Sequence, residues 1–551
     1  MISTSKTHPC TRSEGGFSLI VVLSVMLISS ALLIAGLTAT INDIHLSYSS
    51  SNHTQAYYAA LAGVQEYAYK LQDNPDYWET CEGPSGESES AHYEVTVLAA
   101  ESDTAGKTCE ASNPFTTIIE AKGAHANTFR IEATACSGAT KLTSCAKQAA
   151  NVQVRHVIAT FGVTGFLDFA YFTQYEDEDP SIANEPVSEC EQYYSVRSKN
   201  KNNPCTEIEF APEDGVRGPM HTDDAANVCG SVEFGRKERK EQGDPDTIEI
   251  NGGVNLVCGG SPTYNTATGS YVKGKELKAP ESDSSLKLYV EPANELEGAT
   301  HLVLNGSSNT IEVTNSVGKK SLSWPANGLL YVQKKAKGAA CTYEYQQVAA
   351  DLANEVPEEE GCGTVYVSGT YSKSLTIAAE RELIINGSIV PTGVTPGQEP
   401  TGTDTLGLIA SHFVRIYHPV EETYKKSGSC QGKDKEVKSG ICERINNENE
   451  CDAENASGSL ENPWIYAAIL STSHSFAVDN YDCGKQAPLG KLNIYGAIAQ
   501  KFRGIVGTTG GTGYLKNYVY DERLATDEPP YFLAPLKAGW KVIRETATKA
   551  G

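Results

Sequence analysis

The sequence predicts an α+β protein in which one long N-terminal helix precedes a much larger, mainly β part. The first observation is an apolar run at residues 15–43, in which no charged side chain occurs between Glu14 and Asp43. The second observation is a change in the spacing of apolar residues along the chain. From about residue 88 onward, Val, Ile, Phe and Thr alternate with polar residues or form short clusters between turn residues. A chain of 551 residues exceeds what one core usually supports, so two or three domains are expected.

The apolar run is long enough to cross a bilayer as a helix. From Phe17 to Ile41 it makes roughly 37 Å of helix, against about 30 Å of hydrocarbon. Residues 17–42 are therefore expected to form a transmembrane helix. Helical character continues beyond this span until Asn74 and Pro75 end it. One spine through both parts is the first interpretation, and an anchor followed by a separate short helix is the alternative.

The residues before the helix have the pattern of a particular cleavage signal. A polar leader, residues 1–16, carries Lys6 and Arg12 and ends in Gly16, and the apolar run begins abruptly at Phe17. This order resembles the N-terminus of type IV pilins and type II secretion pseudopilins, in which prepilin peptidase cuts after a glycine and leaves the helix on the mature protein. The resemblance implies cleavage between Gly16 and Phe17. A plain signal anchor and a cleaved secretory signal are the alternatives, although the latter usually has a shorter apolar region.

Val21 departs from the usual pilin pattern. Pilins usually carry Glu at this fifth mature position, where the carboxylate is thought to pair with the N-terminal amine of a neighbouring subunit. Val21 makes the helix similar to X-type minor pilins and K-type minor pseudopilins, which lack this Glu and are associated with filament initiation and the tip. An apolar residue also avoids the cost of a carboxylate in hydrocarbon.

Residues 43–163 are expected to complete a pilin-like head, formed by a helical spine and a β-meander. Four segments have strand character, and we expect them to pair antiparallel: AHYEVTVLAA, NPFTTIIEAKG, TFRIEATACSG and NVQVRHVIATFGV. Helix followed by meander is the order of a pilin head, so the resemblance covers about residues 15–163. Residues 164–540 are then expected to form a β-rich extracytoplasmic domain, and residues 541–551 a C-terminal tail.

Short β-type runs recur between residues 300 and 510. Runs such as GTVYVSG, SLTIAA and RELIING follow one another at short, irregular intervals, and many end in Gly, Asn or Ser. Segments that cannot bury an apolar face alone can do so by stacking, which predicts a parallel β-helix-like solenoid as the core of this domain. A β-sandwich made from the same strands is the alternative.

Cysteine usage predicts export. Cys10 lies in the leader, so cleavage would leave fourteen of the fifteen cysteines, an even number suited to disulfides in an oxidising compartment. Spacing does not fix the connectivity. Pairing neighbours in sequence gives the simplest scheme: Cys81–Cys109, Cys136–Cys145, Cys190–Cys205, Cys229–Cys258, Cys341–Cys362, Cys430–Cys442 and Cys451–Cys483.

Motifs that carry chemistry are scarce. The segment GSYVKGKE, residues 269–276, has the glycine and lysine spacing of a P-loop, but Glu276 stands where a magnesium-binding hydroxyl is needed, so we interpret it as coincidence. The loop GTTGGTG, residues 507–513, is flexible enough to cradle a ligand, and a plain turn explains it equally. His412 and His418 are expected to be surface or satisfied core residues. We expect no cofactor, no metal and, at a net charge of −24, no nucleic-acid partner.

Three groups of acidic residues could bind calcium or act in catalysis. Residues 176–179, Glu-Asp-Glu-Asp, offer oxygen ligands for calcium but lack the spaced glycine of a calcium loop, so a solvated loop is preferred. Asp223 with Asp224, or Asp479 with Asp482, could be paired carboxylates of a polysaccharide hydrolase or lyase. Ordinary turn aspartates have the same spacing.

The favoured hypothesis is a structural subunit and not an enzyme. The resemblance implies a minor pilin or pseudopilin at or near the tip of a type IV pilus or type II secretion-like filament, with a large domain that contacts surfaces or secreted cargo. It implies prepilin peptidase, other pilin-like subunits and an inner-membrane assembly platform as partners. It also implies a single-pass membrane protein with a short cytoplasmic N-terminus and a cell-surface location when assembled. The alternatives are a surface-anchored β-helix polysaccharide-modifying enzyme and a membrane-anchored adhesin outside any filament.

Overall fold

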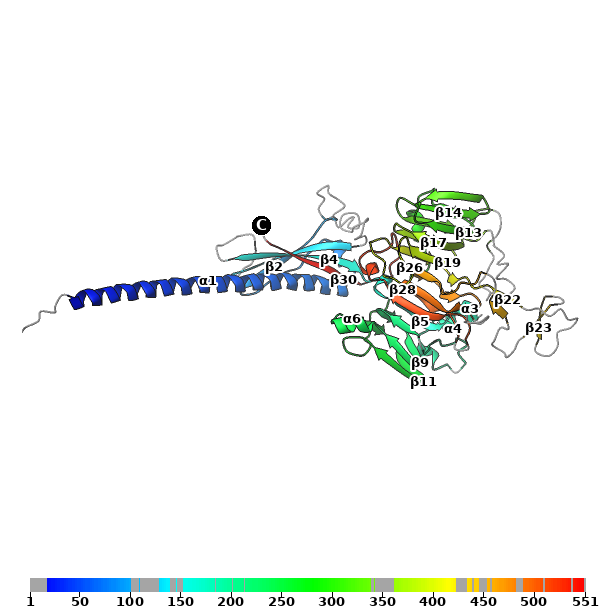
Figure 1. Cartoon of the computed structure of the whole chain (residues 1–551), viewed down its shortest axis with the longest axis horizontal. Helices are drawn as coiled ribbons and strands as arrows, with labels where there is room; N and C mark the ends of the chain where they lie inside the picture. The colour runs from blue at the N-terminus through cyan, green and yellow to red at the C-terminus, as the bar shows by residue number, and fades with distance from the viewer. Residues whose placement is uncertain are drawn as a thin grey trace, which may run out of the picture. The chain divides into compact units, whose positions relative to one another are not determined.

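The computed structural model of the chain divides into two compact units (Figure 1). The first comprises residues 1–119, 129–162 and 541–551, and the second residues 120–128 and 163–540. The structure describes residues 17–100, 109, 128–138, 145, 152–183, 185–200, 202–212, 214–337, 341, 361–422, 434–438, 441–444, 453–455, 458–481, 489–508, 511–536 and 539–549. The leader with Cys10 and Gly16, and the predicted strand NPFTTIIEAKG, lie outside the described residues.

The first unit begins with one uninterrupted helix, α1 (Phe17–Asp73), of 57 residues. The structure therefore has the single spine and not an anchor followed by a separate helix. The helix ends where the sequence predicts: the Asn74 amide still donates to the Lys70 carbonyl at 2.8 Å, and Pro75 has no amide hydrogen with which to continue the ladder. A short 3₁₀ helix, η1 (Tyr77–Thr80), follows.

A five-stranded sheet packs against the second half of α1. Its order is β1 (Ser85–Glu87), β2 (Ala91–Val97), β3 (Thr128–Ser137), β4 (Gln153–Val163) and β30 (Trp540–Lys549). The strands β1, β2 and β3 pair antiparallel, as the predicted meander requires. Residues at helical spacing on α1 are buried against the sheet: Ala56, Ala60, Val64, Tyr67 and Leu71.

An aromatic group fixes this contact. The ring of Tyr67 lies 6.0 Å from that of Phe129 on β3 and 5.6 Å from that of Phe161 on β4, and the two phenylalanine rings stack at 5.3 Å. Such aromatic pairs are worth about 0.5–1.5 kcal/mol beyond the area they bury. The long helix and the sheet therefore share one core.

The prediction that residues 541–551 form a C-terminal tail is wrong, because most of them lie in a strand. Residues 540–549 form β30, which lies next to β4 at the edge of the sheet. A β-carbon on Gly162 of β4 would lie 3.0 Å from the side chain of Ile543, so the two strands approach closely. Pairing covers the polar backbone edge that β4 would otherwise expose. Consequently the second unit is inserted in the sequence between two neighbouring strands of this sheet.

The second unit is mainly β. The helices among its described residues are short, namely α3 (Pro180–Ala183), α4 (Val187–Cys190), α5 (Tyr194–Arg197), α6 (Lys237–Gln242), η2 (Phe166–Asp168), η3 (Ser284–Leu288) and η5 (Glu522–Ala525). Its first strands are β5 (Tyr171–Glu178), β6 (Glu209–Phe210), β7 (Gly215–Arg217), β8 (Met220–Thr222), β9 (Ala225–Phe234), β10 (Ile248–Ile250), β11 (Gly253–Tyr264), β12 (Glu295–Glu297) and β13 (Thr300–Asn305).

The remaining strands complete one large sheet and two small ribbons. The large sheet also contains β14 (Thr310–Asn315), β15 (Gly318–Ser323), β16 (Leu329–Gln333), β17 (Val365–Tyr371), β18 (Leu375–Ala379), β19 (Leu383–Pro391), β20 (Leu406–Ala410), β21 (Val414–Ile416), β26 (Trp464–Ser471), β27 (Phe476–Val478), β28 (Lys491–Arg503) and β29 (Leu515–Tyr520). The ribbons are β22 (Val420–Glu422) with β25 (Ala453–Asn455), and β23 (Asp434–Lys438) with β24 (Ile441–Arg444).

Most neighbours in the large sheet are parallel. One ladder runs β16, β18, β20, β26, β28, β5, β8 and β10, and every step is parallel. A second runs β13, β17, β19, β21 and β27. A third joins β28 to β29, β7, β9 and β11. The exception is the antiparallel meander β13, β14 and β15. Strands from the beginning and the end of the unit therefore meet at β5 and β28, and again at β7 and β29.

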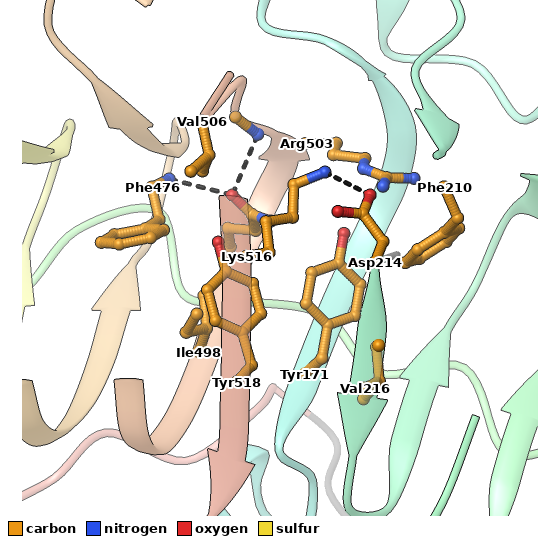
Figure 2. Close-up of a pocket in the computed structure, with 13 residues that line it drawn as sticks. Tyr171, Phe210, Asp214, Val216, Phe476, Ile498, Arg503, Val506, Lys516 and Tyr518 are labelled. Carbon is orange, nitrogen blue, oxygen red and sulfur yellow. Dashed lines mark hydrogen bonds and ion pairs between the residues drawn. The ribbon is translucent and has the colours of Figure 1, made fainter. Parts of the chain in front are cut away.

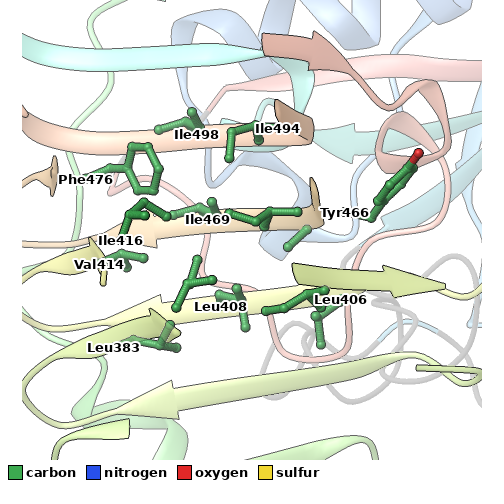
Figure 3. Close-up of a cluster of buried hydrophobic side chains, with 14 of the residues drawn as sticks. Leu383, Leu406, Leu408, Val414, Ile416, Tyr466, Ile469, Phe476, Ile494 and Ile498 are labelled. Atoms are coloured by element: carbon green, nitrogen blue, oxygen red, sulfur yellow. The ribbon is translucent and has the colours of Figure 1, made fainter. Parts of the chain in front are cut away.

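The registers align buried apolar residues in a column across the first ladder. From β16 to β10 the aligned positions are Leu330, Ile377, Leu408, Ile469, Ile498, Tyr171, Met220 and Ile248. All eight are at least 95% buried. Figure 3 shows part of this column, with Leu408, Ile469 and Ile498 on successive strands and Ile416 and Phe476 beside them. Burying each such side chain stabilises the fold by about 1.5–3 kcal/mol.

Five disulfides join neighbours in sequence: Cys81–Cys109, Cys136–Cys145, Cys190–Cys205, Cys229–Cys258 and Cys341–Cys362. These are five of the predicted pairs. Cys430, Cys451 and Cys483, on which the other two pairs depend, lie outside the described residues.

Candidate functional site

The first half of α1 is suited to a membrane by its length and composition. Its segment Leu19–Thr38 has a mean hydropathy of 2.7, and none of it is buried within the protein. The hydroxyls of Ser24 and Ser30 each donate to the carbonyl four residues earlier, at 2.7 Å. Such internal bonds satisfy polar groups that water cannot reach in hydrocarbon. Val21 is 46% exposed in the first turns of the helix, which contain no acidic residue.

The acidic run at residues 176–179 is not a solvated loop. Every residue of β5 is buried, and so is Asp179. Each carboxylate has a specific neighbour: Glu176 pairs with Arg503 at 2.9 Å, Asp177 with Arg197 at 3.5 Å, and Asp179 accepts from the Ser475 hydroxyl at 2.9 Å. The prediction failed because two of these partners, Ser475 and Arg503, lie far away in the sequence, 296 and 327 residues from the carboxylates that they contact.

Arg197 is the centre of one buried polar cluster. Its guanidinium contacts Asp177 and Asp224, and it donates to both carboxylate oxygens of Glu207 at 2.9 Å. Burial raises the pKa of Asp177 to about 9; Arg197 opposes the rise, and Asp224 and Glu207 add to it. Three carboxyls around one guanidinium therefore reduce their charge by keeping a proton on Asp177 at neutral pH.

Asp223 belongs to a different cluster from Asp224. It accepts from the Leu277 amide at 3.1 Å, and His221 bridges it to Glu249 with contacts of 2.9 and 2.6 Å. Burial opposes protonation of His221, but the bonds to the two carboxylates outweigh burial and raise the pKa of this histidine. The two neighbouring aspartates thus face separate partners, and each is at least 95% buried.

Asp479 is held by Arg415, at 2.6 Å, and Arg415 also pairs with Glu382 at 2.8 Å. His418 is a satisfied core residue, as predicted, because its ring contacts the Asp479 carbonyl and the Asn455 side chain, each at 3.0 Å. His412 is half-buried 5.1 Å from the ring of His474, and burial lowers the pKa of His412 to about 4. Asp482 lies outside the described residues.

The sequence motifs form turns and extended segments. Residues 269–276 open no helix, and Glu276 accepts a hydrogen bond from the Tyr193 hydroxyl at 2.8 Å, which is not P-loop geometry. Gly507 and Gly513 form an isolated antiparallel bridge, and the hydroxyls of Thr508 and Thr512 lie 2.7 Å apart.

Two sets of ligand-type atoms come close together, and both include disulfide sulfurs. They are Asp177 with Cys190 and Cys205, and Glu209 with Cys229 and Cys258. A disulfide sulfur is not the thiolate that a metal ion requires. In the described part of the chain, neither set is suited to a metal.

One small, partly open cavity of the second unit, which has both charged and apolar side chains in its lining, was not predicted from the sequence. It has room of ≈ 20 Å³ for water and is lined by Tyr171, Asp214, Arg503, Lys516 and Tyr518 among others. Figure 2 shows the Lys516 amine reaching the Asp214 carboxylate, and the two are 2.7 Å apart. The Tyr171 hydroxyl is buried without a hydrogen-bond partner among the described residues. A cavity of this size holds about one water molecule.

Comparisons of the chain with models of protein families, with curated proteins and with solved structures found no match. The assignment of a function therefore depends on the residues and contacts above.

Proposed function

We propose that this chain is a membrane-anchored, pilin-like structural subunit, cut by prepilin peptidase between Gly16 and Phe17 and carried at or near the tip of a type IV pilus or type II secretion-like filament. The observation that carries the proposal is the division of α1. Its first half is apolar and uncovered over Leu19–Thr38, and its second half packs on a sheet through Ala56, Tyr67 and Leu71. A helix of this kind can anchor a precursor in a bilayer and later pack beside the helices of other subunits.

The second unit is proposed to be the contact domain. Its parallel ladders and the aligned column from Leu330 to Ile248 support a β-helix-like solenoid, in which successive coils bury their apolar faces by stacking. Five disulfides support exposure to an oxidising compartment outside the cytoplasm. Such a stack presents a large, rigid surface to another cell surface or to secreted cargo. No catalysis is required of it.

The carboxylates considered for a polysaccharide-modifying enzyme give that alternative little support. Asp223, Asp224 and Asp479 are each more than 90% buried and bonded to protein groups in separate clusters. Catalytic carboxylates of a glycoside hydrolase flank the scissile bond, so they must reach substrate from one site.

Val21 and the size of the second unit favour the tip. In a filament interior, a subunit without the fifth-position carboxylate leaves a neighbouring N-terminal amine unpaired in an apolar core. An unpaired buried charge costs several kcal/mol, and in a major subunit this cost would recur at every step. One copy at an end avoids the repetition. The implied partners are prepilin peptidase, smaller pilin-like subunits that carry the Glu, and the inner-membrane assembly platform.

Two measurements test the proposal. Mass spectrometry of the purified protein should find Phe17 at the N-terminus, and Gly16→Leu should leave the precursor uncut while Gly15→Ala is still processed. A start at Met1, or beyond Ile41, would contradict the pilin assignment. Immunogold labelling should then find the protein at filament ends. Labelling along the whole filament would exclude the tip, and absence from filaments would favour a surface-anchored adhesin or enzyme.

A further inference from the structure

Lys516 on β29 faces Asp214, which lies directly before the neighbouring parallel strand β7. Strand β29 pairs with β7 so that Tyr518 lies opposite Val216 and Val519 opposite Arg217. Two residues earlier, the same offset places Lys516 opposite Asp214, and the two are 302 residues apart in the sequence. In a parallel ladder, residues two apart lie on the same face, so both side chains point into the cavity that Tyr518 and Val216 line.

The pair is more enclosed than the other lysine ion pairs of the described chain. The side chain of Lys516 is 16% exposed and that of Asp214 is 9% exposed. Lys501 and Glu191 have the same separation of 2.7 Å, but Glu191 is 37% exposed. The other buried ion pairs among the described residues of the unit use arginine or histidine, for example Arg503 with Glu176 and His221 with Asp223. A guanidinium keeps its proton under all ordinary conditions and is not a nucleophile.

The surroundings lower the pKa of the Lys516 amine. Burial lowers the pKa of Lys516; Asp214 raises it, and the Arg503 guanidinium lowers it. The Asp214 carboxylate is also held in place, because the same oxygen that accepts from Lys516 accepts from the Ala211 amide at 3.0 Å. The Lys516 nitrogen lies 2.7 Å from an Asp214 oxygen, so the carbon bonded to that oxygen is the carboxyl carbon that the amine can reach.

We propose that Lys516 and Asp214 are joined by an intramolecular isopeptide bond. The ammonium transfers a proton to the carboxylate within the ion pair, which gives a neutral amine and a carboxylic acid. The Lys516 nitrogen then attacks the Asp214 carboxyl carbon, a C–N bond forms, and a C–O bond breaks. One oxygen leaves as water with the transferred proton and one proton of the amine, so atoms and charge balance without an oxidant or a co-reactant.

The cavity has a place for the product water. Its room of ≈ 20 Å³ fits one water molecule, which the unpartnered Tyr171 hydroxyl can bind. In water, an amine and a carboxylate remain ionised and separate. Effective molarities of roughly 10⁵–10⁸ M for well-aligned groups accelerate the attack, and the loss of hydration on burial favours the uncharged amide over the ion pair.

The position of the bond gives it a structural consequence. The early strands β5 and β7 meet the late strands β28 and β29 at this point of the sheet. None of the five disulfides crosses this junction, because each joins cysteines no more than 29 residues apart. An isopeptide bond would lock the beginning of the unit to its end in a way that reductants cannot undo. This inference does not depend on the proposed pilin function.

Peptide mapping tests the proposal. The exported full chain is reduced, alkylated and digested with trypsin, which would release residues 202–217 and 504–516 separately from an uncrosslinked protein. The expected product is instead residues 202–217 joined to residues 504–523, uncut at Lys516 and lighter than the two peptides by one water. Fragment spectra should place the link on Asp214 and Lys516.

Matched variants complete the test. Lys516→Arg and Asp214→Ala should each abolish the linked peptide, whereas Lys501→Arg, which alters the pair of equal separation whose carboxylate is 37% exposed, should retain it. Recovery of free residues 202–217 and 504–516 from the wild-type protein would establish an ion pair only and overturn the proposal. The wild-type map decides the question even if a variant fails to fold.

Discussion

The guanidinium of Arg197 lies 2.9 Å from the carboxylate of Asp224, and the two side chains are completely buried. Each carboxylate oxygen of Asp224 accepts two hydrogen bonds. One accepts from Arg197 and from the Glu176 amide at 3.1 Å, and the other accepts from the amides of Tyr194 and Ala225 at 2.6 and 2.8 Å. A short helix, α5, and two strands are thus held together by one carboxylate.

Asp224→Asn should destabilise the second unit strongly. Each Asp224 oxygen accepts a hydrogen bond from at least one backbone N–H group. In Asp224→Asn, the NH₂ group of the asparagine side chain would replace one of these oxygens and would face an N–H donor. Removing one partner of a buried charge pair costs about 3–5 kcal/mol. Urea unfolding at pH 7, followed by intrinsic fluorescence, measures the change. A loss below about 1 kcal/mol would show that the cluster relaxes around the amide.

Asp177→Asn should have the opposite effect, although Asp177 contacts the same arginine. With a pKa raised to about 9, Asp177 is protonated in the folded protein at pH 7 and ionised in the unfolded chain, so folding must take up a proton. Asparagine resembles the protonated acid and avoids this uptake. We expect the free energy of unfolding to rise by roughly 1–3 kcal/mol at pH 7. A loss of stability similar to that of Asp224→Asn would mean that Asp177 is ionised.

Asp283 should make stability depend on pH between about 4 and 7. It is buried, its carboxylate accepts from the hydroxyls of Tyr331 and Ser411 at 2.9 Å each, and burial raises its pKa to about 7. For a raised pKa the contribution to stability is complete below the unfolded value near 4 and is lost as pH rises through 7. Asp283→Asn should therefore match the wild type near pH 4 and exceed it at pH 8, by roughly 2–4 kcal/mol.

Comparing the wild type with Asp283→Asn separates the effect of Asp283 from that of other titrating residues, because the two proteins share every other carboxyl group. Urea midpoints at pH 4, 6 and 8 are the measurement. Equal pH profiles for the two proteins would contradict the raised pKa.

The local features of this chain were predictable and the polar interior was not. Period and composition locate α1, its end at Asn74 and the β-rich remainder, since these follow from neighbouring residues. The five disulfides within the described residues also join sequence neighbours. The partners of Glu176 and Asp214, by contrast, lie 327 and 302 residues away. An acidic run whose cations come from a distant strand looks like a solvated loop, and only the register of β28 with β5 reveals that it is buried.

The role of residues 540–549 was missed for a similar reason. The segment has the composition of a polar surface strand, and its place beside β4 depends on chain ends that are far apart in sequence. An alternating pattern near a terminus is compatible with a tail or an edge strand. The topology decides between them.

Gly369 should tolerate no side chain. Its φ is +117°, and an added β-carbon would lie 2.2 Å from the Leu304 carbonyl oxygen on the neighbouring strand β13. Gly369→Ala therefore combines backbone strain with a clash against fixed backbone. Gly393 is the matched control, because its φ is +83° and nothing lies within 4 Å of the added atom.

We expect Gly393→Ala to lose about 1 kcal/mol from backbone strain alone and Gly369→Ala to lose clearly more. Thermal unfolding of the two variants beside the wild type measures the difference. Equal losses would show that β13 and β17 can move apart without cost.

The disulfides should differ in their reactivity toward reductants according to exposure. Cys190 and Cys205 are buried, at 0% and 7% exposed, whereas Cys258 is exposed at the surface of β11. Exchange requires a thiolate to reach a sulfur atom, so access limits the rate. Under native conditions a small thiol should reduce Cys229–Cys258 first and leave Cys190–Cys205 intact until the unit unfolds. Timed alkylation followed by peptide mass spectrometry follows each bond separately, and adding urea to the same reaction is the control. If both bonds open at one rate in native buffer, reduction proceeds through opening of the whole unit, and exposure in the folded state does not control it.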